Sequence, residues 1–253
     1  MNAMAVSGIV FGCAFGGASL GMFLHYALPA DHISDQSKGV LTMAIGIIGT
    51  MAALVVGLLI ASAKSSFDKL DNDVKQSAGE VLLLDRALAH YGPETKHARD
   101  MIGRALAVRL AATWPEDSSL AAKIEIPGTT QGIEAIEDTI RALAPQNDAQ
   151  RELRSRALDL VGALEETRWL VTGGTGSSIP IPFLVVVTLW FTVILAVIGL
   201  FAPRNATVVA ILFVSSLSVA GSIFLILEMD QAFDGLVKIS SAPLRYALAH
   251  LGQ

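Results

Sequence analysis

Four stretches of this chain are long and apolar enough to cross a bilayer as helices, and none of them contains a charged residue. A bilayer core needs about 20 apolar residues in helical form. With 53% hydrophobic and 16% charged residues, the chain is also more apolar than a soluble domain, in which roughly 25% of residues are charged. The sequence therefore predicts an all-α membrane protein with four transmembrane helices, at Ala5–Leu24, Val40–Ala63, Ile181–Phe201 and Ala206–Leu227.

Most of the charged residues lie between the second and third of these stretches. We therefore expect a helical cytoplasmic domain at 64–172, inserted between a first transmembrane hairpin at 1–63 and a second at 173–228. The charges that remain lie in the two short loops, at Glu228 just after the fourth span, and in a tail at 229–253. A net charge of -5 argues against a nucleic-acid partner. The single cysteine, Cys13, excludes an intrachain disulfide.

Apolar residues in the middle domain repeat at spacings of three and four, which predicts helices throughout. Proline and glycine punctuate them, as in "YGP" at 91–93 and at Pro115 and Pro145. The expected helices run from Phe67 to Tyr91, from Glu94 to Trp114, around Ile133–Leu143 and over Leu153–Leu170. The stretches "PEDSS" and "IPGTTQG" are expected to bracket a loop or a short element, and "GGTGSS", residues 173–178, is expected to be a flexible joint.

Basic residues near span ends predict the orientation, because cytoplasmic loops are enriched in Lys and Arg. Only Lys38 and Arg204 fall on one side of the four-span arrangement, and the other basic residues near the spans fall on the opposite side. Both termini and the middle domain are thus expected in the cytoplasm, with both hairpin loops outside. In the second loop, Pro203 should end one span and Asn205 should cap the next.

The second span and the first cytoplasmic helix are expected to be one helix, since no proline or glycine separates them after Gly57. A helix from Val40 to Tyr91 would be about 75–80 Å long. The heptad phase of its cytoplasmic part extends back into the span, where the residues on that face are mostly small. This face supplies the candidates for a pore lining: Gly46, Gly49, Ala53, Val56 and Ile60.

Three glycines of the first span, Gly8, Gly12 and Gly16, lie four residues apart. This small-xxx-small pattern is typical of close helix packing in membranes. We favour a partner helix in the same subunit, with a helix of another subunit as the alternative.

Charged residues meet at the expected cytoplasmic lip of the spans. Lys64 ends the second span there, and Glu228 and Asp230 end the fourth. One interpretation is an interfacial ion pair or acidic anchor; another is a charged ring at a pore mouth. A calcium loop in "EMDQAFDG" is disfavoured, because Ala232 stands where an oxygen ligand is needed.

Other polar residues give weaker indications. Asp31, His32 and Asp35 in the first loop are too loosely placed to predict a metal site. Hydroxyl residues within the spans either line a polar path or bond carbonyls of their own helix, and we favour the latter. These are Thr42, Thr50, Thr188, Thr192, Ser215, Ser218 and Ser222. No signature of an enzyme or of a cofactor site appears.

The tail after the fourth span predicts a short helix opened by Ser241 and Pro243. Its apolar face comprises Leu244, Ala247, Leu248 and Leu251. The helix could lie on the membrane or pack against the cytoplasmic helices. We favour packing, because Arg245 is its only strong base and membrane-surface helices are usually richer in Lys and Arg.

Five segments of the chain, in order, resemble the bestrophin-like family of bacterial membrane proteins. They are "LPADHISDQSK", "GLLIASAKSSFD", "LLLDRALAHYGPE", "GLFAPRNATVVA" and "FLILEMDQAFDGLVKISSAPLR". The resemblance implies a multi-pass protein of the bacterial inner membrane. Bestrophins proper are oligomeric ion channels, mainly for anions, with four spans and a helical cytoplasmic body. This chain lacks their Arg-Phe-Pro tripeptide and their calcium-binding run of acids, so the resemblance does not support calcium gating.

Two functions are therefore open. The first is a homo-oligomeric ion channel or pore in the lipid bilayer, lined by the second span. The second is a non-conducting membrane scaffold or signalling protein whose cytoplasmic helices bind a partner. The absence of an ionisable residue in mid-membrane argues against an ion-coupled transporter.

Overall fold

The computed structural model describes residues 2–29, 35–115, 132–173, 179–233 and 235–252, without the side chains of 35–36 and 167–173. Several sequence predictions lie outside these residues. They concern the side chains of Asp31, His32, Asp35 and Asp234, most of the loop between residues 115 and 132, and nearly all of the joint at 173–178.

The described chain is all helical, as predicted, and contains no strand. Its helices are α1 (Ala3–Ala27), α2 (Asp35–Tyr91), the 3-10 turn η2 (Pro93–Thr95), α3 (Lys96–Thr113), α4 (Ile133–Arg141), α5 (Asp148–Gly173), α6 (Ile181–Phe201), α7 (Ala206–Asp230) and α8 (Ala242–His250). Four of them, α1, α6, α7 and the first part of α2, are long and apolar enough to span a membrane. The prediction that the second span continues without a break to Tyr91 is confirmed.

The ends of the helices follow from local sequence. The side chain of Asn205 accepts a hydrogen bond from the Val208 amide at 2.8 Å and so caps α7, as predicted. At the other end of α2, Gly92 has φ +146° just before Pro93. A side chain is strained at such a backbone angle, so glycine at this position lets the chain leave the helix.

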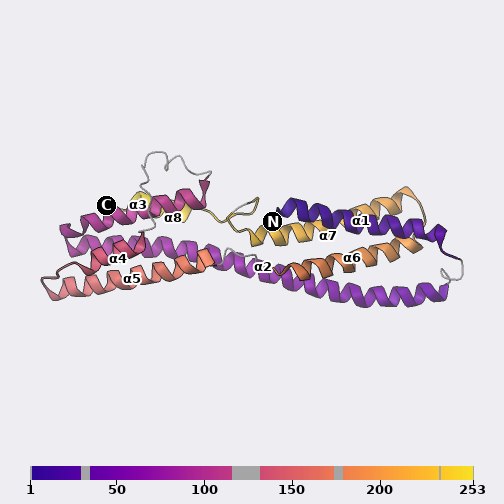
Figure 1. Ribbon diagram of the computed structural model, residues 1–253, viewed down its shortest axis with the longest axis horizontal. Helices are drawn as coiled ribbons and strands as arrows, with labels where there is room; N and C mark the ends of the chain where they lie inside the picture. Colours follow the sequence, from indigo (N-terminus) through magenta and orange to yellow (C-terminus); the bar gives the residue numbers. More distant parts are fainter. Residues whose placement is uncertain (1, 30–34, 116–131, 174–178, 234, 253) are drawn as a thin grey trace. The chain divides into compact units, whose positions relative to one another are not determined.

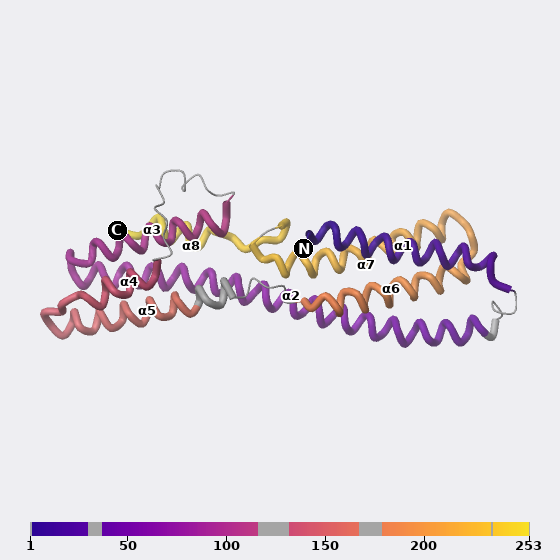
Figure 2. Tube along the Cα trace, viewed as in Figure 1, coloured from indigo at the N-terminus to yellow at the C-terminus, as the bar shows by residue number. Residues whose placement is uncertain are grey.

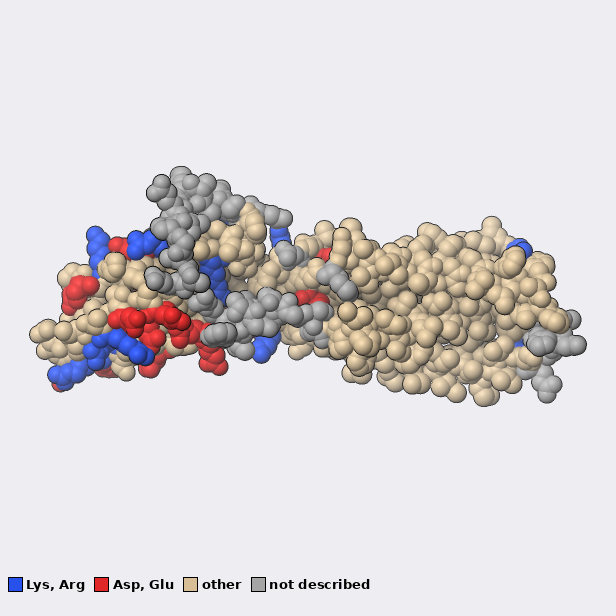
Figure 3. All heavy atoms as spheres, in the orientation of Figure 1, with Lys and Arg blue, Asp and Glu red and all other residues tan. Residues whose placement is uncertain are grey.

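The chain divides into two compact units. Unit 1 comprises Met1–Phe67 and Ser177–Val237, and unit 2 comprises Asp68–Gly176 and Lys238–Gln253. Unit 1 contains α1, α6, α7 and the first part of α2, whereas unit 2 contains the rest of α2 with α3, α4, α5 and α8. In Figure 3 the visible face of unit 1 is almost free of charged residues, and charged side chains of both signs cover much of unit 2.

Within unit 1, α1 packs against α6 and α7, which also contact each other (Figures 1 and 2). Helices far apart in the sequence thus form the centre of the unit. Small residues allow α1 and α6 to approach closely. A Cβ added to Gly21 would lie 1.9 Å from the Ala196 carbonyl oxygen, and one added to Gly199 would lie 2.2 Å from that of Ala18. Both positions therefore require glycine.

The first part of α2 is the least buried of the four candidate spans. Ala52, Leu59 and Ala63 are buried on one side of it, and the last two join an apolar cluster with residues of α1, α6 and α7. Large apolar residues are exposed elsewhere on the same helix: Val40, Met43, Ile47, Met51, Leu54 and Leu58. The packing of the spans into two hairpins remains a prediction, because the main neighbours of α1 are α6 and α7.

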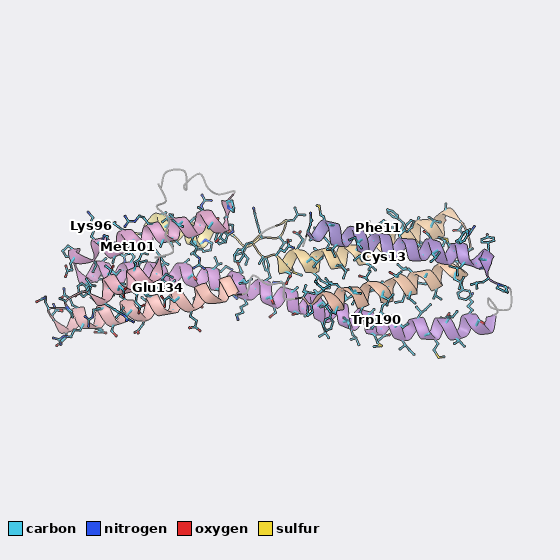
Figure 4. The ribbon with its side chains drawn as sticks, in the orientation of Figure 1. Phe11, Cys13, Lys96, Met101, Glu134 and Trp190 are labelled. Carbon is cyan, nitrogen blue, oxygen red and sulfur yellow. The ribbon has the colours of Figure 1, made fainter. Side chains whose placement is uncertain are left out.

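Unit 2 has its own core, which includes Leu84, Leu88, Ile140 and Val161. α3 packs against α4 and α8, and α4 packs against α5. Figure 4 labels Met101 on α3, whose sulfur accepts a hydrogen bond from the Thr139 hydroxyl of α4 at 3.8 Å.

The C-terminal tail is fastened to unit 2 at two points. The Trp114 indole N–H donates to the Ile239 carbonyl oxygen at 2.9 Å in a buried hydrogen bond. The Gly252 amide donates to Asp85 at 3.2 Å. Helix α8 packs against α3. The structure thus agrees with the prediction that the tail helix packs against other helices.

Candidate functional site

Glu228 lies in the last turn of α7, and it is a buried carboxylate, only 6% exposed. Its Oε2 accepts a hydrogen bond from the Leu236 backbone amide at 2.6 Å. Burial of a carboxylate is costly unless a donor compensates for the lost water. The chain after α7 therefore turns back, and its backbone supplies that donor.

Gly235 makes this turn possible. Its φ is +105°, and a Cβ at this position would lie 2.5 Å from Glu228 Oε2. A side chain would thus be strained in its backbone and would collide with the carboxylate. We name Glu228, Gly235 and Leu236 the lip turn. Sequence reasoning singled out Glu228 but missed its partners, although a glycine shortly after the end of a helix was a usable signal.

The other two predicted lip charges occupy different surroundings. Lys64 is exposed on α2, and Asp230 is half-buried at the last position of α7. Both take part in polar or electrostatic interactions. A charged ring made by several subunits remains a prediction.

The five predicted lining residues of α2 fall into two groups. Gly49 and Val56 are half-buried and face the rest of unit 1: a Cβ on Gly49 would lie 4.0 Å from Ile194 of α6, and Val56 packs on the apolar cluster of the unit. Gly46, Ala53 and Ile60 are exposed. We call these last three residues the open α2 strip. Among the predicted residues, only this strip is available to line a path outside the subunit.

The predicted glycine face of α1 is also open. Gly8, Gly12 and Gly16 are exposed, and no described atom lies within 4 Å of a Cβ added to any of them. The expected partner helix in the same subunit is therefore not found in the described chain. Gly17 and Gly21, on another side of α1, are the glycines that contact α6. Cys13 and the Phe11 ring, which is stacked on Phe15, are labelled on this helix in Figure 4.

Hydroxyl groups in the spans bond to their own helices. Each donates to the carbonyl oxygen four residues earlier at 2.7–3.0 Å. This holds for Thr42, Thr50, Thr188, Thr192, Ser218 and Ser222. The favoured interpretation is confirmed for these six residues, since their protons are used within the helix.

Sequence reasoning missed a polar cluster at the opposite end of unit 1. Arg204, between α6 and α7, donates to the Met22 carbonyl oxygen at 2.6 Å, and its guanidinium carbon lies 3.9 Å from the centre of the Tyr26 ring. His25 Nδ1 donates to the Leu200 carbonyl oxygen at 2.9 Å. A cation is favourable near the C-terminus of a helix, here α1. The cluster thus fastens the end of α1 to the α6–α7 connection.

The described residues provide no group of three or more His, Cys, Asp or Glu side chains that could hold a metal ion. The arrangement instead holds a turn at one end of α7 and the α6–α7 connection at the other end, and it leaves the open α2 strip exposed.

An all-helical chain with four apolar spans and a separate charged helical unit belongs to the class of multi-span membrane proteins. The sequence model of the bestrophin-like domain matches residues 12–244. The chain is therefore a member of the bestrophin-like family, as its sequence segments indicated. Among curated proteins and among solved structures, no significant match is found.

Proposed function

We propose that this protein forms a homo-oligomeric ion pore in the bacterial inner membrane, with α2 as the lining helix and no enzymatic activity. The observation that carries the proposal is the state of α2 in the single chain. It is an apolar span with little of its surface buried, and its open strip, which includes the small residues Gly46 and Ala53, is exposed in the described chain. Assembly around an axis would give that strip a function.

The exposed surface of α2 separates into two sides. At roughly 100° per residue, Gly46 and Ala53 lie on one flank of the buried face, and the exposed residues Ile47 and Leu54 lie on the far side of the helix. Small residues on one flank suit a helix that borders a narrow path. Large apolar residues on the far side suit lipid or a neighbouring helix. Adjacent residues Ala53 and Leu54 thus form a matched pair for a test.

The test uses the full-length chain with Cys13→Ala, so that introduced cysteines are the only ones. The purified protein is sized by native mass spectrometry and reconstituted in planar bilayers. Ala53→Cys and Leu54→Cys variants are then exposed to a charged, water-soluble thiol reagent. We expect an oligomer that conducts, a block of current in Ala53→Cys, and little effect in Leu54→Cys.

Two outcomes contradict the proposal: a stable oligomer without conductance, or a current that modification of Ala53→Cys leaves unchanged. The scaffold alternative has its own support in unit 2, a compact unit that exposes Leu83 and Tyr246. It predicts a stoichiometric protein partner in pull-downs that is lost when residues 94–170 are deleted. A non-conducting oligomer with such a partner would establish the alternative.

A further inference from the structure

We propose that the lip turn is a membrane-interface anchor, in which Leu236 and Val237 lie at the boundary between acyl chains and headgroups of the leaflet where α7 ends. The inference goes beyond the pore proposal. It depends only on the membrane class of the protein and does not require conduction.

The first step is exposure. Leu236 is 75% exposed and Val237 is 40% exposed, although the Leu236 amide is hydrogen-bonded to the Glu228 carboxylate. Single exposed apolar residues are common on proteins. Whether the exposure of Leu236 and Val237 has a function therefore depends on where these residues lie in the structure.

The second step is depth. Leu236 is eight residues beyond Glu228 in sequence, yet its amide lies 2.6 Å from the Glu228 carboxylate. The turn has therefore returned to the level of the last turn of α7. The uncharged run of α7 continues to Leu227, and Leu225, one turn before Glu228, exposes an apolar side chain. Leu236 thus belongs to the level where the apolar span ends, within the same compact unit.

The third step concerns how the turn is held. A buried carboxylate at the end of a span persists because an amide compensates it. Gly235 allows the backbone to come this close. Glu228 is accordingly a positioning residue: its carboxylate fixes the backbone while the apolar side chains of Leu236 and Val237 remain outside.

Lipid is the occupant that these observations favour over a second copy of the chain. Leu236 lies at the level where the apolar run of α7 ends, with Leu225 exposed one turn earlier, and the ends of membrane spans lie at the boundary between acyl chains and headgroups. Apolar side chains that follow a span directly can enter this boundary without moving the helix.

The test places an environment-sensitive fluorophore on single cysteines in the full-length Cys13→Ala protein. Leu236→Cys is compared with Leu225→Cys, on the exposed side of α7, and with Leu83→Cys, exposed on unit 2. The protein is reconstituted in phosphatidylcholine–phosphatidylglycerol vesicles, in which a fraction of the phosphatidylcholine is spin-labelled near the headgroup. Iodide serves as the aqueous quencher.

We expect the Leu236 probe to be quenched by the spin-labelled lipid several-fold more than the Leu83 probe, and by iodide several-fold less. Iodide quenching equal to that at Leu83 would overturn the proposal. Protection from both quenchers would also overturn it, because protein would then cover the turn.

A pair of Glu228 variants tests whether the carboxylate holds the turn in place. In Glu228→Gln the amide oxygen still accepts from Leu236, so the lipid quenching should persist. In Glu228→Ala the acceptor is lost, and quenching of the Leu236 probe should shift from lipid towards iodide. Equal lipid quenching in both variants would refute the positioning role of Glu228. Unchanged Leu225 quenching serves as the control that the span itself remains in place.

Discussion

Buried polar atoms in unit 2 differ in whether they have a partner. The Thr95 hydroxyl lies 2.6 Å from the Leu88 carbonyl oxygen and 2.7 Å from that of Gly92, where α2 passes into η2. The Ser77 hydroxyl is equally buried, but has no hydrogen-bond partner among the described residues. A buried hydroxyl stabilises a fold only when its hydrogen bonds are made.

This contrast gives a first prediction. Thr95→Val should lower the stability of the protein by about 1–2 kcal/mol. Ser77→Ala should leave the stability within about 0.5 kcal/mol or raise it, because no hydrogen bond is lost. Thermal unfolding of the full chain in detergent measures both. A larger loss of stability in Ser77→Ala than in Thr95→Val would contradict this difference between the two hydroxyl groups.

The Asp85–Arg99 pair joins α2 to α3 through two hydrogen bonds of 2.7 and 2.9 Å. Asp85 is buried and also accepts from the Gly252 amide. The hydrogen bond to Asp85 raises the pKa of Arg99 above its ordinary value, despite the opposing effect of burial. The contribution of Arg99 is therefore complete below its unfolded pKa and is lost only at more alkaline pH, so stability near neutrality should not depend on its titration.

A second prediction concerns this pair. Asp85→Asn should destabilise the protein by about 2–4 kcal/mol, because the half-buried Arg99 guanidinium loses its counter-charge at a buried position. The matched control is Asp148→Asn, which removes an ion pair with Arg151 on the surface and should have little effect. Unfolding midpoints of the two variants are compared under one condition. Equal midpoints would show that the Asp85–Arg99 pair stabilises the protein no more than the surface pair does.

At the scale of elements, glycines of the same helix have different functions. Gly21 lies where α1 meets α6, whereas Gly12 has open space around it. Both follow the spacing that favours close packing in membranes. Which of them packs within the chain depends on which side of α1 faces α6.

The third prediction uses this pair of positions. Gly21→Ala should destabilise the packing of α1 on α6, since the added methyl group meets backbone that cannot move aside easily. Gly12→Ala should leave the fold of the single chain intact, because there is space for a methyl group. Resistance to unfolding by denaturing detergent reports on both. If Gly12→Leu also reduces the oligomer while the chain stays folded, the open face belongs to a contact between subunits.

At the scale of the whole molecule, the distribution of charge separates the chain into a part suited to lipid and a part suited to water. The basic residues near the spans predict that unit 2 lies in the cytoplasm. The cluster around Arg204 occupies the other end of the spans, between α6 and α7.

The fourth prediction follows from this orientation. In a Cys13→Ala background, Arg141→Cys should react with a membrane-impermeant maleimide only after the inner membrane is permeabilised. Lys38→Cys should react in intact spheroplasts. Labelling of Arg141→Cys from the periplasmic side would reverse the topology and would remove the basis for a cytoplasmic lip.

Sequence alone determined the order of the helices and which of them are apolar enough to span a membrane. Ile181–Phe201 was predicted with the bounds that the structure has, and the continuity of α2 across the end of the span followed from the absence of Pro and Gly between Leu58 and Val74. These predictions depend on local features, because apolarity, periodicity and helix-ending residues each act within a single segment of the chain. The tertiary structure decided which faces meet. It placed Gly21 and not Gly12 against α6, brought Leu236 back to Glu228, and set Arg204 beside Tyr26. Those choices depend on shape and hydrogen bonding between segments far apart in sequence, and no single segment contains that information.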